Sequence, residues 1–280
     1  MPSKQWLIFT DLDGTLLDHD TYSVAPAKDT LHQLATKHIP VIPTTSKTFA
    51  EMKAINKNLN LNGPCIVENG AAIHIPHTFL KQKPTDTRWQ GNMWVKTFSN
   101  QKRVWLEILN QLKPEFGDKF THFDAMSVGD VSNITGLSTH DATLAKTRQF
   151  GEPVLWQGDE KDKLRFIDAL KSKGASVLHG GRFLHVSGHG DKGQALKWLC
   201  DEYRRQFPEQ DTHSLALGDG GNDIAMLETA DVAVIVRSPA HSPPTVNRTH
   251  QLHVTRSTGP VGWAESVNEL VLTPLKEATW

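Results

Sequence analysis

The chain has 280 residues, and we expect it to divide into a core of ordinary size and a second, smaller domain. Its 30 Lys and Arg residues balance 31 Asp and Glu residues, and this net charge of -1 lacks the basic excess that proteins use to bind nucleic-acid backbones. The sequence contains no long apolar N-terminal segment and no run approaching about 18 apolar residues, so we expect neither export nor membrane spanning and predict a cytoplasmic protein. Cys65 and Cys200 are expected to be buried free thiols.

The first third of the chain alternates short apolar runs with amphipathic stretches. Residues 6–10, 40–43 and 65–67 have the composition of strands. Between them, residues 26–35 and 48–58 carry apolar side chains at helical spacing. This β-α-β-α-β order predicts a parallel sheet with right-handed crossovers.

The same alternation returns after residue 190. Residues 196–203 place apolar side chains on one helical face, and residues 215–217 and 232–236 are nearly all apolar. Strands of this kind are typical of a sheet that is covered on both sides. We therefore predict that these strands rejoin the first sheet.

The middle of the chain, residues 86–186, is less regular. It contains a helix-like stretch at 101–112 and strand-like stretches at 153–156 and 182–186. We predict an α/β fold in which a doubly wound, Rossmann-like parallel sheet carries an inserted α+β domain.

The predicted boundaries assign residues 1–85 and 187–280 to the core and residues 86–186 to the insert. Beyond about residue 239 the chain is rich in Pro, Ser, Thr and His before a last amphipathic stretch at 261–271.

Acidic residues follow two of the predicted strands. Asp11 and Asp13 come after the first strand, and Asp219 and Asp223 after the strand at 215–217. The carboxyl ends of parallel strands border one crevice, so these carboxylates would repel one another unless a cation held them. Oxygen ligands favour Mg²⁺. The alternative for each segment is a solvated acidic turn or a capped helix.

Two other motifs fit these segments poorly. A calcium loop would need Gly and Glu where this chain has Leu16 and Tyr22. A dinucleotide-binding fingerprint would need Gly or Ala at the position of Asp223. A zinc pair of His185 and His189 is disfavoured because a Gly intervenes and no helix is predicted there.

Hydroxyl and ammonium groups also stand at strand and helix ends. Thr44, Thr45, Ser46 and Lys47 follow the second strand, where hydroxyls and backbone N–H groups form an anion site. Lys192 opens a predicted helix and could neutralise a phosphate dianion, although a single Lys at a helix start is usually just solvated.

Taken in order, these segments resemble the haloacid dehalogenase-like (HAD) hydrolase superfamily. The resemblance rests on DLDGTLL at 11–17, a strand-end Thr, a Lys and GDGGND at 218–223. It implies a Mg²⁺-dependent phosphatase in which Asp11 attacks phosphorus and forms an aspartyl-phosphate. It implies that Asp13 acts as general acid and then as general base.

The same resemblance implies roles for the remaining residues of these segments. Asp11, Asp219 and the backbone carbonyl of Asp13 would hold Mg²⁺, with Asp223 as a ligand or as a partner of the ligands. Thr45, or in its place Thr44, would bind the transferring phosphoryl group, and Lys192 would offset its charge.

The insertion after the third strand resembles Cof-type members with an α/β cap. Within them, residues 46–48, 68–73, 148–153 and 181–186 look like the mannosyl-3-phosphoglycerate phosphatase branch. Such a substrate needs cations, and the resemblance implies six substrate-binding candidates: Ser46, Lys47, Asn69, Arg148, Arg182 and Asn222. For each Arg the alternative is an ordinary surface ion pair.

The resemblance also contains one departure. Phe49 stands where this branch often has Arg, so the sugar or acid specificity can differ here.

We therefore predict hydrolysis of mannosyl-3-phosphoglycerate, or a close glycosyl-3-phosphoglycerate, to glycosylglycerate and phosphate. The expected partner is this small phosphorylated molecule, and we expect a monomer or a homodimer. The alternatives are a sugar-phosphate phosphatase of other specificity, a phosphohexomutase and a catalytically silent sugar-phosphate sensor.

Overall fold

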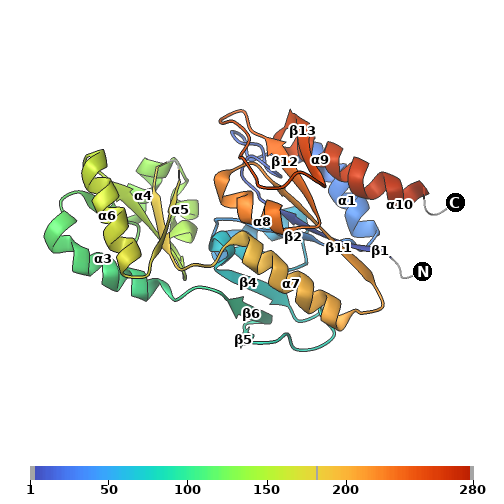
Figure 1. Cartoon of the computed structure of the whole chain (residues 1–280), viewed down its shortest axis with the longest axis horizontal. Coiled ribbons are helices and arrows are strands. Elements are labelled where there is room, and N and C mark those ends of the chain that lie inside the picture. Colours follow the sequence, from blue (N-terminus) through green and yellow to red (C-terminus); the bar gives the residue numbers. More distant parts are fainter. Residues whose placement is uncertain (1–3, 181, 278–280) are drawn as a thin grey trace.

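The computed structural model describes residues 4–180 and 182–277, with only the backbone described at 276 and 277. The chain forms two lobes, a core and a cap, and the cap carries helices α3 to α6 (Figure 1). Within the described residues no helix is both long and apolar enough to cross a lipid bilayer. Cys65 and Cys200 are buried free thiols, as predicted, and burial raises the pKa of each to about 12.

The core is built on a five-stranded parallel sheet. Its strands in spatial order are β13 (Leu252–Thr258), β12 (Val232–Arg237), β11 (Asp211–Gly218), β1 (Lys4–Thr10) and β2 (Val41–Pro43). The prediction that the strands after residue 190 rejoin the first sheet is confirmed. The edge strand β13 escaped prediction because an edge strand is half solvated, and its sequence LHVTRST contains no apolar run.

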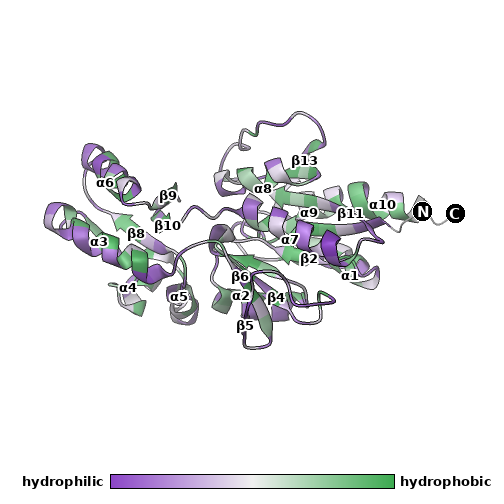
Figure 2. Cartoon of the chain, turned by 60° about the horizontal axis from the view of Figure 1, so that its bottom comes forward, coloured by the Kyte–Doolittle hydropathy of each residue, from purple (hydrophilic) through white to green (hydrophobic). Residues whose placement is uncertain are grey.

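Helices cover both faces of this sheet. Along β1, Trp6 and Ile8 point to one face while Leu7 and Phe9 point to the other. The first face packs against α1 (Lys28–Thr36), α2 (Phe49–Leu59) and α9 (Gly259–Val267), and the second against α7 (Lys192–Gln206) and α8 (Ile224–Thr229). Figure 2 shows apolar core strands between helices of mixed hydropathy. The predicted doubly wound fold is therefore confirmed.

Short helical segments complete the core. They are the 3₁₀ turns Ala25–Ala27, Glu68–Gly70 and Gly221–Asp223, the π-helical turn Asn268–Leu272 and α10 (Thr273–Glu277).

The third predicted strand belongs to a second sheet. β3 (Cys65–Val67) lies beside β2 and is joined to this part of the chain by one parallel bridge, between Thr44 and Ile66. It pairs antiparallel with β4, in a second sheet of order β3, β4 (Ala72–Pro76), β6 (Met93–Thr97) and β5 (Arg88–Gln90). The third predicted strand therefore runs parallel to the chain after β2 at this bridge, as expected, but the tight turn Glu68–Gly70 then sends the chain back along β3, and this antiparallel pair was not predicted.

β5 and β6 fall within the residues that we assigned to the insert, and they pair with β4. The boundaries 1–85, 86–186 and 187–280 stay a prediction. The cap has its own antiparallel sheet of order β7 (Phe120–His122), β8 (Glu152–Trp156), β10 (Leu184–Ser187) and β9 (Ser176–His179). The helix and the two strands predicted in this part of the chain are confirmed.

Four helices pack on the cap sheet. α3 (Lys102–Phe116) and α6 (Glu160–Ser172) bury Trp105, Phe116 and Phe166 against it. α4 (Val128–Thr135) and α5 (Thr139–Lys146) form a smaller cluster.

Candidate active site

Three carboxylates meet at the carboxyl ends of two neighbouring strands. Asp11 follows β1 and Asp219 follows β11, and the strands stay paired to that point, since the Asp11 N–H donates to the Leu217 carbonyl at 2.9 Å. Asp11, Asp219 and Asp223 are all buried, and one oxygen of each lies within 4.8 Å of the others. These are three of the four acidic residues predicted for the metal site.

Gly14 allows this close approach. Its φ of +78° belongs to the left-handed region, and a Cβ at this position would lie 2.6 Å from Asp219 Oδ2. A larger residue would be strained and would push against the carboxylate.

Lys192 binds two of the carboxylates. It is the first residue of α7, whose N-cap Asp191 accepts from the Gln194 N–H at 2.7 Å. Its buried Nζ lies 2.7 Å from Asp11 Oδ1 and 2.6 Å from Asp223 Oδ1. Burial alone lowers the pKa of Lys192, but the two carboxylates outweigh it and raise that pKa. The ammonium group therefore stays charged.

The carboxylates themselves are short of positive charge. Burial raises the pKa of Asp11 to about 8, against the opposing effect of Lys192. Burial, and then the neighbouring Asp223, also raise the pKa of Asp219. Both shifts mean that the residues of this chain supply too little positive charge to balance the ionised carboxylates.

Asp223 also fixes the loop that carries Asp219. Its Oδ2 accepts from the N–H groups of Asp219 at 3.1 Å and Gly220 at 2.9 Å, while Oδ1 faces Lys192. With both oxygens engaged, Asp223 is better placed to support the other groups than to supply a free ligand atom.

Asp13 lies outside the group of three and faces Lys47. Its Oδ2 is 2.7 Å from Lys47 Nζ, whereas its Oδ1 is buried with no hydrogen-bond partner among the described residues. Burial alone would lower the pKa of Lys47, but the nearby Asp13 carboxylate favours the charged ammonium group. The net effect raises the pKa of Lys47.

The whole set fits a divalent cation. Four carboxylates and two ammonium groups leave a formal charge of about −2, and one buried carboxylate oxygen lacks a partner. A hard cation with oxygen ligands, such as Mg²⁺, matches both features.

The two candidate threonines differ in what their hydroxyls do. The Thr44 hydroxyl donates to the Ile42 carbonyl of its own strand at 3.1 Å. The Thr45 hydroxyl accepts from the Lys47 N–H at 3.2 Å, which leaves its proton for another acceptor. This difference favours Thr45 as a donor to a phosphoryl group.

Polar groups from separate segments meet beside Thr45. The Asn69 N–H donates to the Thr45 carbonyl at 2.9 Å, and the Asn222 amide donates to Asn69 Oδ1 at 3.2 Å. The structure thus joins the two asparagines that we singled out.

The two arginine candidates lie in different surroundings. The Arg148 guanidinium donates to the Ser46 carbonyl at 3.1 Å and lies 3.6 Å from Glu68 Oε2. Arg182 is exposed and donates to the Ile134 carbonyl within the cap. Gly181, part of the same motif, lies outside the described residues.

Residues that the sequence did not single out also reach this site. The Thr15 hydroxyl donates to Asp219 Oδ1 at 3.3 Å, and His241 Nε2 lies 3.2 Å from Asp219 Oδ2. Thr15 could have been found from its place in the DLDGTLL segment. His241 gave no signal, because it comes from a loop rich in Pro and Ser that only the fold brings to Asp219.

Known proteins resemble this chain over nearly its whole length. A glucosyl-3-phosphoglycerate/mannosyl-3-phosphoglycerate phosphatase of Methanococcoides burtonii is 37% identical over 266 residues, 95% of this chain and 97% of that protein. A phosphatase of the HAD superfamily from Bacteroides thetaiotaomicron has a TM-score of 0.68 at 18% identity, over 95% of each chain. The sucrose-phosphatase from Synechocystis has a TM-score of 0.56 at 14% identity, over 95% of this chain and 98% of that one.

The two structural likenesses concern the fold alone. The family model described as haloacid dehalogenase-like hydrolase matches residues 8–242, most of the chain. With the Methanococcoides relative, this match confirms the predicted enzyme class: the chain belongs to the haloacid dehalogenase-like hydrolases and is a phosphoric monoester hydrolase.

Proposed function

We propose that the protein is a Mg²⁺-dependent phosphatase that converts mannosyl- or glucosyl-3-phosphoglycerate to the glycosylglycerate and inorganic phosphate. The observation that carries this proposal is the buried ion-pair group of Lys192 with Asp11 and Asp223, next to Asp219. The substrate follows the name of the relative that is 37% identical over 95% of this chain. We keep a cytoplasmic location, and a monomer or homodimer, as predictions.

In this proposal Asp11 is the nucleophile. One of its oxygens forms a bond to phosphorus while the bond from phosphorus to the glycerate oxygen breaks, giving an aspartyl-phosphate. Lys192 holds the Asp11 carboxylate at 2.7 Å and offsets charge on the phosphoryl group. Thr45 donates its free hydroxyl proton to a phosphoryl oxygen.

Asp13 carries the proton in both half-reactions. It protonates the departing glycerate oxygen and then takes a proton from the water that attacks the aspartyl-phosphate. Its partner Lys47, at 2.7 Å, orients the carboxylate. Mg²⁺ would be held by Asp11, Asp219 and the backbone carbonyl of Asp13, and it would neutralise charge on the phosphoryl oxygens.

The glycosyl end of the substrate has a cavity beside Lys47. A hollow of about 540 Å³ lies between α2, the loop with Tyr22 and Ser23, and the cap helix α5, and both Lys28 and Lys47 line it. This volume is within the range of small-molecule sites. Lys28 and Lys47 bring positive charge to this cavity, Glu51 and Asp141 also line it, and Lys47 is paired with Asp13 at 2.7 Å.

A substrate panel tests the proposal. We expect purified protein with Mg²⁺ to release phosphate fastest from mannosyl- or glucosyl-3-phosphoglycerate, compared with simple hexose phosphates. Asp11→Asn, which changes volume very little, should fold normally and release none. Phosphate release by Asp11→Asn would refute the assigned nucleophile, and preference for a hexose phosphate would refute the substrate.

The same panel separates the alternatives. A phosphohexomutase would yield an isomeric hexose phosphate in place of free phosphate, and a silent sensor would bind a sugar phosphate without turnover.

A further inference from the structure

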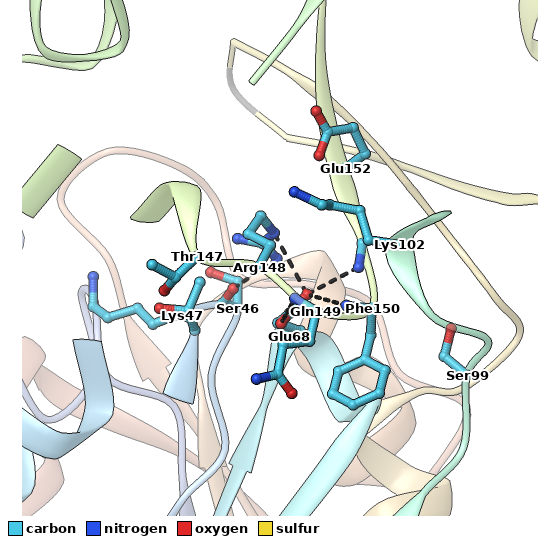
Figure 3. A network of polar contacts seen from close by, with 12 residues as sticks. Ser46, Lys47, Glu68, Ser99, Lys102, Thr147, Arg148, Gln149, Phe150 and Glu152 are labelled. Carbon is cyan, nitrogen blue, oxygen red and sulfur yellow. Dashed lines mark hydrogen bonds and ion pairs between the residues drawn. The ribbon is translucent and has the colours of Figure 1, made fainter. Parts of the chain in front are cut away.

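Besides its two covalent connections, the cap touches the core where the Thr48 hydroxyl donates to the Leu144 carbonyl at 3.1 Å, and again at the turn that carries Glu68. The chain leaves the core through residues 98–101 and returns through residues 187–191. Between them in sequence, residues 148–151, which we call the strap, lie against the core turn Glu68–Gly70 (Figure 3). Two segments that the sequence analysis marked for their resemblance, 68–73 and 148–153, thus bind each other.

Glu68 makes this contact with its carboxylate. Oε1 accepts from the Gln149 N–H at 2.7 Å, and Oε2 accepts from the N–H groups of Phe150 at 3.0 Å and Gly151 at 2.9 Å. Arg148 Nε lies 3.6 Å from Oε2, and Glu68 is 4% exposed. Hydrogen bonds to a buried charge are stronger than neutral ones, so the strap is firmly held.

The strap is bound equally to the cap. Its Gln149 carbonyl accepts from the Lys102 N–H at 2.7 Å, and its Phe150 carbonyl accepts from the Trp105 indole N–H at 2.7 Å. The Phe150 side chain is buried in the hydrophobic cluster of the core, with Ala71 and Val95. The strap therefore links α3 of the cap to Glu68 of the core.

The turn that carries Glu68 also contacts the catalytic segments. The Glu68 N–H donates to the Lys47 carbonyl at 2.9 Å, and the Asn69 N–H donates to the Thr45 carbonyl at 2.9 Å. At Gly70, with φ of +93°, a Cβ would lie 2.1 Å from the Asp191 carbonyl oxygen, next to Lys192. Glu68 and Asn69 themselves adopt φ of +49° and +58°, a conformation that the surrounding contacts must enforce.

We infer that Glu68 is a positioning residue, the pivot that fixes the cap against the segments of Thr45, Lys47 and Lys192. This inference rests on the proposed function, because only a substrate large enough to reach the cap depends on where the cap sits. The side chain touches neither the acidic group nor the cavity beside Lys47, so it acts through the strap.

The chain offers a matched control in Glu152. This buried carboxylate, 1% exposed, follows the strap directly, but it binds His122 at 2.9 Å and the Asp124 N–H at 2.6 Å, both within the cap. Glu68→Gln and Glu152→Gln each replace a buried carboxylate by an amide of equal size. At Glu68 both oxygens accept from backbone N–H groups, so the amide must set its NH₂ group against a donor, whereas both partners of Glu152 contact Oε1 and the amide oxygen can replace it there. Both cost stability, but only Glu68→Gln loosens the cap.

The kinetic test compares a large and a small substrate. Because Glu68→Gln loses one charged hydrogen bond, we expect it to lower kcat/KM for mannosyl-3-phosphoglycerate about tenfold or more, mainly through KM. The kcat/KM for p-nitrophenyl phosphate should stay nearly unchanged. Glu152→Gln should leave the ratio of the two substrates at its wild-type value. Glu68→Asp keeps the charge but has a shorter side chain, and it is the second variant should Glu68→Gln not fold. Its ratio of kcat/KM for the large substrate to kcat/KM for the small one should lie between the wild-type value and a value about tenfold lower.

Hydrogen exchange tests the pivot without any turnover. The amides of residues 149–151 should exchange about 10- to 100-fold faster in Glu68→Gln than in wild type, and at wild-type rates in Glu152→Gln. Equal exchange in the two variants, or an equal loss on both substrates, would overturn the pivot. If the wild-type protein hydrolysed neither substrate, the proposed function would fail, and exchange alone would decide the pivot.

Discussion

Replacing Lys192 by methionine removes a buried positive charge from between two carboxylates while keeping the length of the side chain. The ammonium group is 0% exposed and lies 2.7 Å from Asp11 and 2.6 Å from Asp223. Breaking a buried pair in this way costs about 3–5 kcal/mol, because the remaining charges stay buried without a partner. For a chain of this size each kcal/mol corresponds to about 2–4 °C, so we expect Tm to fall by roughly 6–20 °C without metal.

Thermal unfolding with EDTA and with Mg²⁺ measures this effect. A bound Mg²⁺ supplies positive charge to Asp11 and to the neighbouring carboxylates, so the deficit of Lys192→Met should shrink in saturating Mg²⁺. Lys47→Met is the control, because the side chains of Lys47 and Asp13 are 17% and 37% exposed, so breaking their ion pair should cost less than breaking the fully buried one. If Lys192→Met lost no more stability than Lys47→Met in EDTA, the argument from buried charge would be wrong.

Three further predictions concern the metal site and a buried histidine. Asp219→Asn should raise the Mg²⁺ concentration needed for half-maximal phosphate release at least severalfold, and an unchanged metal titration would remove Asp219 from the ligands. Gly14→Ala should abolish most activity and cost about 1–2 kcal/mol in urea unfolding, because φ is +78° and its Cβ would lie 2.6 Å from Asp219 Oδ2; wild-type activity would contradict that steric argument. His74 is stacked on Phe49, and burial lowers its pKa to about 4. Between about pH 6.5 and 4, His74 is therefore protonated in the unfolded chain but not in the folded protein. His74 should therefore contribute about 3 kcal/mol to the fall in stability as pH drops through that window. Burial lowers the pKa of His185 to about 4 as well, so the test compares the fall in wild type with that in His74→Gln, and falls of equal size would show that His74 contributes nothing.

Local patterns were enough to predict much of the core. The strand before Asp11 and the helix after Lys192 follow from apolar spacing and from the residues that end each element. β3 was harder, because its neighbour depends on the turn at Glu68 and Asn69. The pair Asn69-Gly70 is a common turn signal, but Glu68 at positive φ is not, and the antiparallel return to β4 was not predicted.

The same limit applies to the site. The sequence marked Asp11, Asp13 and Lys192 by their positions, yet it could not say that Lys192 would bind Asp11 and Asp223 while Lys47 takes Asp13. Such pairings depend on the relative placement of elements far apart in the chain.

By itself the sequence determined the types of the main core elements and the residue types at their ends, because both depend on side-chain spacing of a few residues. Only the tertiary structure decided which carboxylates share one pocket, that His241 reaches Asp219, and that Glu68 binds the strap. The physical reason is that these contacts join residues that are distant in the sequence, 83 residues in the case of Glu68 and Gly151. In the strap, the partners of Glu68 are backbone N–H groups, which every residue except proline offers and which no side-chain pattern reveals.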